Sequence, residues 1–111
     1  MTLLNPERFT IRTGTRTASF SSEEIDWIEA AGNYVKLYTR GSYHLLRETI
    51  KNLERRLDPN QFVRVHRSAI VNRDRIREVQ PLLHGDCYVL LHDGTRVTCS
   101  RTYSHRLNVP V

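Results

Sequence analysis

The chain has 111 residues, of which 39% are hydrophobic, and its 17 Lys and Arg outnumber its 12 Asp and Glu to give a net charge of +5. This length allows one domain with one modest core and excludes two. No apolar run approaches the roughly 18 residues of a membrane span, and the N-terminus lacks a signal-peptide pattern. We therefore expect a single domain over residues 1–111, located in the cytoplasm and without membrane contact.

The first part of the chain predicts two hairpins with a helical turn between them. Runs of β-forming residues flank Thr13-Gly14 and Arg40-Gly41, and such turn dipeptides join antiparallel strands. Ser21 or Ser22 is expected to cap a single helical turn. The residues that follow are expected to contribute Ile25, Trp27 and Ala30 to the core.

One segment has helical periodicity. A stripe of apolar residues at spacings of 4, 3 and 4 marks one helix face, namely Leu46, Ile50, Leu53 and Leu57. Asp58-Pro59 ends it, because the residue before proline resists the helical region. We predict one short helix at about Glu48–Leu57.

Positive charge gathers in the middle of the sequence. Residues 44–77 hold nine Lys and Arg but four Asp and Glu, so this block carries the entire net charge. The basic residues of the predicted helix lie off its apolar stripe and are expected to form a solvated face. The arginines between Arg64 and Arg77 outnumber the nearby acids Asp74 and Glu78, which favours a surface for an anionic partner.

The last hairpin surrounds Asp93-Gly94, a dipeptide that favours a two-residue type I′ turn. Pro81 is expected to place the preceding strand at an edge or a bulge. The register predicted from the turn puts these pairs on one face, taken as the buried one: His92 with Thr95, Leu90 with Val97, and Tyr88 with Cys99.

Metal binding is not expected. His84, Cys87, His92 and Cys99 are potential zinc ligands, but four such ligands must converge on one point. In the predicted register Cys87 faces Ser100, so the two thiols lie on opposite sides of the hairpin and share neither a metal nor a disulfide. We expect no metal and no cofactor.

Catalysis is not expected either. Ser68 lies two residues after His66, but no acid is placed to orient the histidine, and no glycine-rich phosphate loop is present. Polar and aromatic residues at strand ends suit nucleic-acid binding instead. From composition and spacing alone, both DNA and RNA remain possible partners.

Three stretches in the same order then support a family resemblance: EEIDWIEAAGNYVKLYT, LLRETIKNLERRLDPNQFVRVHRSAIVNRDRIREV and GDCYVLLHDGTRVTCSRTY. Together they resemble the LytTR-type DNA-binding domain of bacterial transcription regulators, from about Arg8 to Leu107. The pattern F-x-R-x-H-R-S-x-I-V-N carries most of this specificity.

The resemblance implies a mainly β fold of about ten short antiparallel strands in stacked small sheets. It implies binding of double-stranded DNA through loops that enter the major groove, at paired direct or inverted repeats occupied by two protomers. Such domains usually follow a receiver domain or membrane segments in longer regulators. No such segment is seen here, so we expect either an excised portion or a stand-alone form.

Site residues follow from the same resemblance, position by position. Base contacts are expected from Asn33, Tyr34, Arg67 and Arg101. Phosphate contacts are expected from Lys36, Ser68, Ser100 and Tyr103. Trp27, His66 and Asn72 also match the family pattern and are interpreted as structural. The predicted function is sequence-specific duplex DNA binding by a transcription regulator that is not an enzyme; the alternative is a basic interaction module for RNA or an acidic protein.

Overall fold

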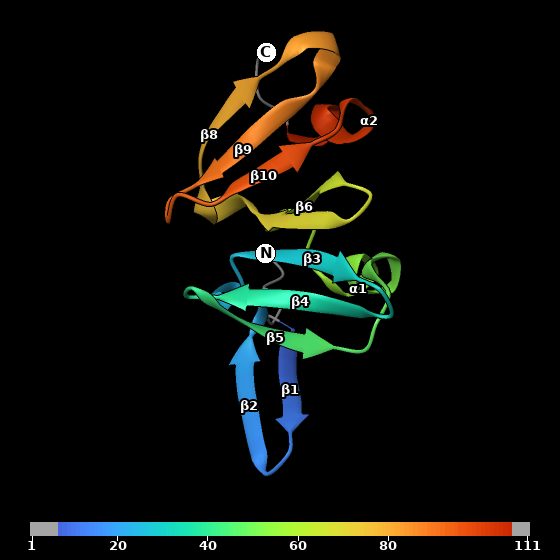
Figure 1. Ribbon diagram of the computed structural model, residues 1–111, viewed down its shortest axis with the longest axis vertical. Helices are drawn as coiled ribbons and strands as arrows, with labels where there is room; N and C mark the ends of the chain where they lie inside the picture. Colours follow the sequence, from blue (N-terminus) through green and yellow to red (C-terminus); the bar gives the residue numbers. More distant parts are fainter. Residues whose placement is uncertain (1–6, 108–111) are drawn as a thin grey trace, which may run out of the picture.

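A computed structural model describes residues 7–107, which form ten short strands and little helix (Figure 1). The strands are β1 (Arg8–Thr13), β2 (Arg16–Ser21), β3 (Trp27–Ala31), β4 (Tyr34–Thr39), β5 (Ser42–Leu46), β6 (Phe62–His66), β7 (Ala69–Asn72), β8 (Ile76–Pro81), β9 (Cys87–Leu91) and β10 (Arg96–Cys99). The α-helices are α1 (Ile50–Arg56) and α2 (Arg101–Ser104), and short 3-10 turns cover Ser22–Glu24, Arg73–Arg75, Leu83–Gly85 and His105–Leu107. The mainly β prediction is confirmed.

The strands form three antiparallel sheets stacked along the long axis of the molecule. A two-stranded sheet pairs β1 with β2, a five-stranded sheet has the order β5-β4-β3-β7-β6, and a three-stranded sheet has the order β10-β9-β8. Figure 1 shows the three-stranded sheet at the top, the five-stranded sheet in the middle and the β1–β2 hairpin at the bottom. Among the described residues, no helix is long and apolar enough to cross a membrane.

Two hydrophobic clusters lie on opposite faces of the five-stranded sheet, which corrects the expectation of a single core. One packs that sheet against α1 and the β1–β2 hairpin, and the other packs it against the three-stranded sheet. Strands β6 and β7 serve both, because Phe62 and Ile70 point into the first cluster while Val63 and Val71 point into the second. Because β7 is buried on both faces, it is apolar at nearly every position.

The hairpins and the helical turn predicted for the first part of the chain are present. The hairpins at Thr13-Gly14 and Arg40-Gly41 form as expected. The helical turn begins after Ser21, whose backbone N–H donates to the Glu24 carboxylate at 2.9 Å. Helix α1 is shorter than predicted at both ends. Thr49 is its N-cap and accepts a hydrogen bond from the Asn52 N–H at 3.1 Å, while Leu57 is already extended.

A second short helix corrects the prediction of one. Helix α2 follows β10 directly and is stabilised by backbone bonds from Tyr103 and Ser104 to the Ser100 carbonyl. A helix of four residues is too short to leave an apolar stripe in the sequence, and for that reason the pattern missed it.

The predicted register of the last hairpin is wrong by one residue. Asp93 does not have positive φ, which a type I′ turn requires, whereas Gly94 does, at 92°. The Gly94 N–H donates to the Leu91 carbonyl, and the Leu91 N–H donates to the Thr95 carbonyl. The loop between Leu91 and Thr95 therefore contains three residues and not two. Strand pairing consequently aligns residue 90 with Arg96.

This shift reverses the prediction for the two cysteines. Cys87 lies directly opposite Cys99, and both point into the second hydrophobic cluster as free thiols. On β9 the buried residues are Cys87, Val89 and Leu91 in place of the expected Tyr88 and Leu90, whereas Val97 and Cys99 of β10 are buried as expected. Strand β8 is an edge strand with an irregular register, as Pro81 predicted.

Candidate nucleic-acid interface

Three chain segments meet along one side of the molecule, on the right in Figure 1. They are the β3–β4 turn, the β6–β7 turn and the start of α2, called here tips 1, 2 and 3. Tips 1 and 2 are joined by a bond from the Ala30 N–H to the Ser68 carbonyl at 2.9 Å. Tip 3 is joined to β6, the strand that leads into tip 2, by a bond from the Ser100 N–H to the Val65 carbonyl, also at 2.9 Å. Because these are backbone bonds, the sheets fix the spacing of the tips.

Tip 1 exposes two of the predicted base-contacting residues. Gly32 turns the chain with φ of 64°, and Asn33 and Tyr34 follow it, both exposed. Lys36 lies farther along β4, where it pairs with Glu29 across the strands. Its Nζ atom sits 4.9 Å from the centre of the Tyr43 ring. The structure thus separates Lys36 from the tip itself.

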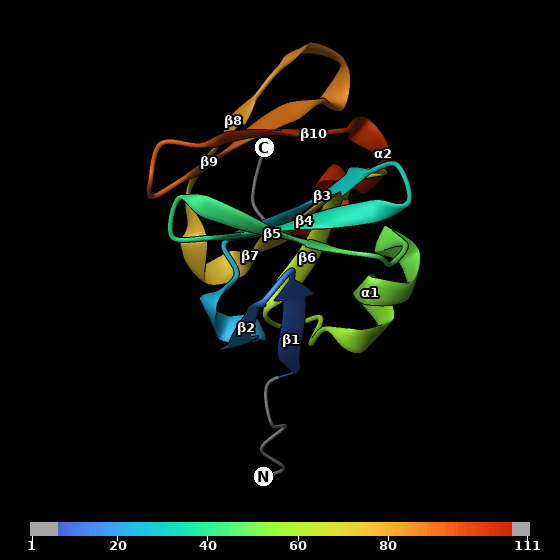
Figure 2. The same ribbon diagram turned by 60° about the horizontal axis from the view of Figure 1, so that its bottom comes forward.

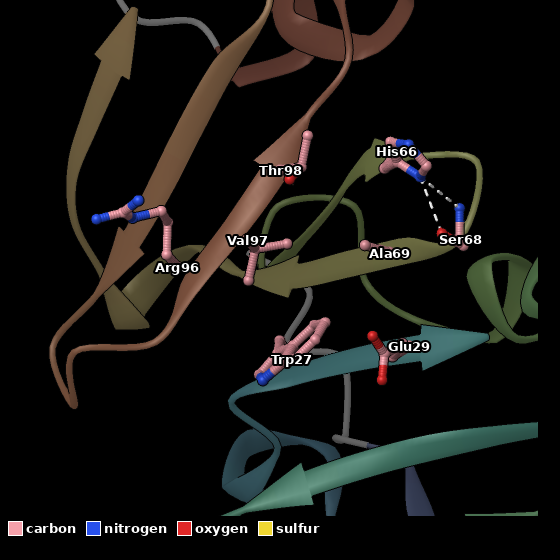
Figure 3. Close-up of a pocket in the computed structure, with 8 residues that line it drawn as sticks. All are labelled: Trp27, Glu29, His66, Ser68, Ala69, Arg96, Val97 and Thr98. Atoms are coloured by element: carbon pink, nitrogen blue, oxygen red, sulfur yellow. Dashed lines mark hydrogen bonds between the residues drawn. The ribbon is translucent and has the colours of Figure 1, made fainter. Parts of the chain in front are cut away.

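Tip 2 consists of Arg67 and Ser68, and the Arg67 side chain is exposed. His66 and Ser68 form a local clamp, in which Nδ1 of the imidazole lies 2.9 Å from the Ser68 hydroxyl and accepts the Ser68 N–H at 3.2 Å (Figure 3). The interpretation of His66 as a structural residue agrees with these bonds. The Ser68 hydroxyl is therefore already in contact with the His66 imidazole.

Tip 3 is shaped by the loop between β8 and β9. The Asp86 carboxylate accepts the Arg101 N–H at 2.8 Å and thereby caps α2. Gly85 lies so close to the stem of Arg101 that a Cβ atom there would approach its Cγ to 2.8 Å. Arg101 itself remains exposed. Neither Gly85 nor Asp86 was singled out in the sequence as a functional residue.

Tyr103, a predicted phosphate contact, is half-buried, and two guanidinium groups lie near its ring. Arg64 lies 5.5 Å and Arg106 4.8 Å from its ring centre. Ser100 is half-buried at the start of α2. The structure brings seven of the eight predicted site residues to the three tips, and Lys36 is the exception.

Comparison with known proteins identifies the family to which the chain belongs. The family model described as the LytTr DNA-binding domain matches residues 15–109. The chain belongs to this family. Its fold matches a solved LytTr DNA-binding domain, that of a methyl-accepting/DNA response regulator from Bacillus cereus, with a TM-score of 0.82 and 22% identity over 91% of this chain and 93% of that one.

Curated relatives contain the same domain within longer chains. The chain is 35% identical over 91 residues to a response regulatory protein of Vibrio cholerae, covering 78% of this chain and 34% of that protein. It is 34% identical over 77 residues to the CO-responsive transcriptional regulator RcoM of Rhodospirillum rubrum, covering 69% and 33%. The sensory transduction protein LytT of Bacillus subtilis is 26% identical over 100 residues, covering 90% and 42%. The chain thus spans less than half the length of these relatives.

The family is one of DNA-binding domains.

The structure of this LytTr domain shows which of its central arginines have acidic partners. The expectation that the central arginines lack acidic partners is wrong for two of them. Arg64 pairs with Glu54 at 3.1 Å, and Arg75 pairs with Asp26 at 2.8 Å. The second pair joins residues 49 positions apart, so a count of neighbouring acids could not reveal it.

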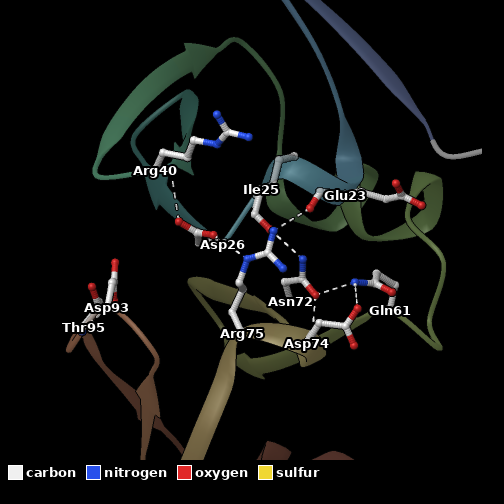
Figure 4. Close-up of polar contacts among 10 residues, drawn as sticks. All are labelled: Glu23, Ile25, Asp26, Arg40, Gln61, Asn72, Asp74, Arg75, Asp93 and Thr95. Carbon is white, nitrogen blue, oxygen red and sulfur yellow. Dashed lines mark hydrogen bonds and ion pairs between the residues drawn. The ribbon is translucent and has the colours of Figure 1, made fainter.

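Figure 4 shows the polar cluster around Arg75. The Asp26 carboxylate also accepts the Arg40 N–H at 3.2 Å, and Arg75 donates to the Glu23 carbonyl at 2.9 Å. Next to it, the side-chain amide of Asn72 donates to the Ile25 carbonyl at 2.8 Å. These bonds join the 3-10 turns Ser22–Glu24 and Arg73–Arg75 to the central sheet, so the cluster is structural.

An open cleft of about 290 Å³ lies between β3, β7 and β10, behind tip 2 (Figure 3). Trp27, Glu29 and His66 line it, together with residues of β10. Glu29 is already engaged, since it accepts the Tyr38 hydroxyl at 2.9 Å. Within residues 7–107, no group of three or more His, Cys, Asp or Glu side chains is arranged to hold a metal ion.

Proposed function

We propose that this LytTr domain binds double-stranded DNA at specific sequences and that its three tips read base edges in the major groove. The observation that carries the proposal is the state of two arginines. Arg67 and Arg101 are exposed on adjoining tips, and within residues 7–107 their guanidinium groups form no hydrogen bond or ion pair. An unengaged guanidinium on a rigid support suits bidentate pairing with guanine.

The remaining tip residues receive roles from their exposure and chemistry. Asn33 or Tyr34 supplies the third base contact, because both are exposed on tip 1. Ser68, Ser100 and Tyr103 lie beside the readers and are assigned to phosphate oxygens, which position a protein on the duplex without reading its sequence. Lys36 is the least favoured of the four predicted phosphate contacts, since its ammonium already lies against the Tyr43 ring.

We further propose that two protomers bind paired repeats and that the domain serves a transcription regulator in the cytoplasm. The basis is the family and its relatives, which include a transcriptional regulator and a response regulatory protein. Selection of bound sites from a random duplex library tests this directly. Two half-sites at a fixed spacing are expected, and a single unpaired site would contradict binding by two protomers.

Titrations by fluorescence anisotropy then test specificity. The selected duplex is expected to bind more tightly than random duplex or single-stranded RNA at the same salt concentration. Affinity should fall steeply with salt, because bound lysines and arginines release counterions from the phosphates. Equal affinity for all three nucleic acids would overturn sequence-specific binding.

The roles of the two readers are tested by substitution. Arg67→Ala and Arg101→Ala should each cost about 1–3 kcal/mol on the selected site and relax the preference at one base position. Lys51→Ala is the control, since Lys51 is exposed on α1 outside the three tips. Unchanged binding by Arg67→Ala together with lost binding by Lys51→Ala would place the interface elsewhere.

A further inference from the structure

We propose that Arg64 is a positioning residue, which holds tip 2 in its binding conformation from inside the protein, and that Glu54 fixes Arg64. This inference rests on the proposed DNA-binding function and deepens it. It assigns to Arg64 a role that differs from a phosphate contact, although the residue is cationic and lies three positions before Arg67.

The guanidinium of Arg64 is directed at the backbone of tip 2. Its Nε–H donates to the His66 carbonyl at 3.1 Å, and Nη2 donates to the Arg67 carbonyl at 2.5 Å. The pairing of β6 with β7 is irregular between Arg64 and His66, and a bulge interrupts the regular ladder of backbone bonds. The Arg64 side chain therefore supplies hydrogen bonds where the sheet is irregular.

Glu54 holds the third nitrogen of the same group. Nη1 of Arg64 lies 3.1 Å from one carboxylate oxygen of Glu54, and the other oxygen lies 3.1 Å from Nη1 of Arg106. Arg64 and Arg106 both face the ring of Tyr103 in α2. One carboxylate on α1 thus connects tip 2 with the segment that carries tip 3.

The same geometry excludes Arg64 from direct phosphate binding. All three guanidinium nitrogens have partners inside the protein, and the side chain is only 12% exposed. Its charge is offset by Glu54. Arg64 therefore acts on DNA through Arg67, whose carbonyl it binds.

Arg64→Lys separates positioning from charge. Lysine keeps the positive charge but lacks the planar fork that binds two carbonyls and a carboxylate together. We expect its affinity for the selected duplex to fall, by up to the roughly 5- to 150-fold expected for loss of a base contact. Affinity for random duplex and the salt dependence should stay as in the wild type. Wild-type affinity for the selected duplex would overturn the proposal.

A double variant tests whether Arg64 acts through Arg67. Adding Arg64→Lys to Arg67→Ala should cause no further loss of affinity, because the reader that Arg64 positions is already absent. Losses that multiply would mean that Arg64 makes a contact of its own, and would overturn the proposal.

Glu54→Gln gives a test in which the two explanations differ in sign. Removing a negative charge beside a polyanion should strengthen binding, whereas loss of positioning should weaken binding to the selected duplex. Glu78→Gln is the control, since Glu78 is exposed on β8 and its carboxylate bonds only to Gln80 among the described residues. We expect Glu54→Gln to weaken specific binding and Glu78→Gln not to. Tighter binding by both would overturn the proposal.

Thermal unfolding of each variant establishes that it is folded before binding is measured. The wild-type protein separates this inference from the proposed function. If the wild type does not distinguish the selected duplex from random duplex, the proposed function fails. If it does distinguish them and Arg64→Lys and Glu54→Gln do so equally well, only the positioning role fails.

Discussion

The stem of Arg101 lies against Gly85, so a residue without a side chain decides where this guanidinium can go. A Cβ atom at Gly85 would lie 2.8 Å from Cγ and 3.2 Å from Cδ of Arg101. The family pattern points to Arg101, whereas nothing in the sequence marks Gly85 as part of the same site. The contact joins positions in different loops, so only the folded chain reveals it.

Gly85→Ala is therefore expected to weaken binding to the selected DNA by displacing Arg101. It will also lower stability by about 1–2 kcal/mol, because alanine is strained at φ of 84°. Gly41→Ala is a matched control, with φ of 83° and no atom within 4 Å of the added Cβ. Both variants should lose similar stability in urea denaturation, but only Gly85→Ala should lose DNA affinity. Equal affinities would contradict the steric role of Gly85.

At the scale of elements, the sequence predicts features that depend on near neighbours. The hairpins, the capped turn and the core of α1 follow from turn dipeptides, capping residues and apolar spacing. The register of β9 with β10 was missed because it depends on the φ of Asp93, which the dipeptide Asp93-Gly94 does not determine. Long-range ion pairs such as Arg75 with Asp26 were missed because spacing in the chain carries no information about them.

Asn72 joins several elements and gives a prediction at this scale. It is fully buried, donates to the Ile25 carbonyl, and accepts the Asp74 N–H at 3.0 Å (Figure 4). Asn72→Ala leaves a buried carbonyl without its partner, which costs about 1–3 kcal/mol. Asn60→Ala is the control, since Asn60 is exposed and should change stability by less than about 0.5 kcal/mol. Equal urea midpoints for the Asn72→Ala and Asn60→Ala variants would show that the buried hydrogen bonds of Asn72 do not contribute to stability.

For the whole molecule, two weakly acidic side chains, the buried Cys99 thiol and the half-buried Tyr38 hydroxyl, make stability depend on pH in the alkaline range. Burial raises the pKa of the Cys99 thiol from its ordinary value of 9.0 to about 12, with a further contribution from Cys87 beside it. Burial and the bond to Glu29 raise the pKa of the Tyr38 hydroxyl from 10.0 to about 12. Both groups thus stay protonated in the folded chain at pH values where the unfolded chain ionises.

The free energy of unfolding should therefore fall as the pH rises from about 9 to 12, because the folded state then binds more protons than the unfolded state. Urea denaturation at a series of pH values measures this. Cys99→Ala removes one of the two groups and should make the decline less steep. A free energy that is constant across this range would mean that neither group is protected by the fold.

The hairpin of β6 and β7 lies between the two hydrophobic clusters and contributes side chains to both. Removing this hairpin from the five-stranded sheet exposes apolar residues of both clusters at once. The layers are therefore not expected to unfold one at a time. Unfolding should be cooperative across all three sheets. Tip 2 is the end of this hairpin, so the placement of Arg67 is lost only when the whole domain opens.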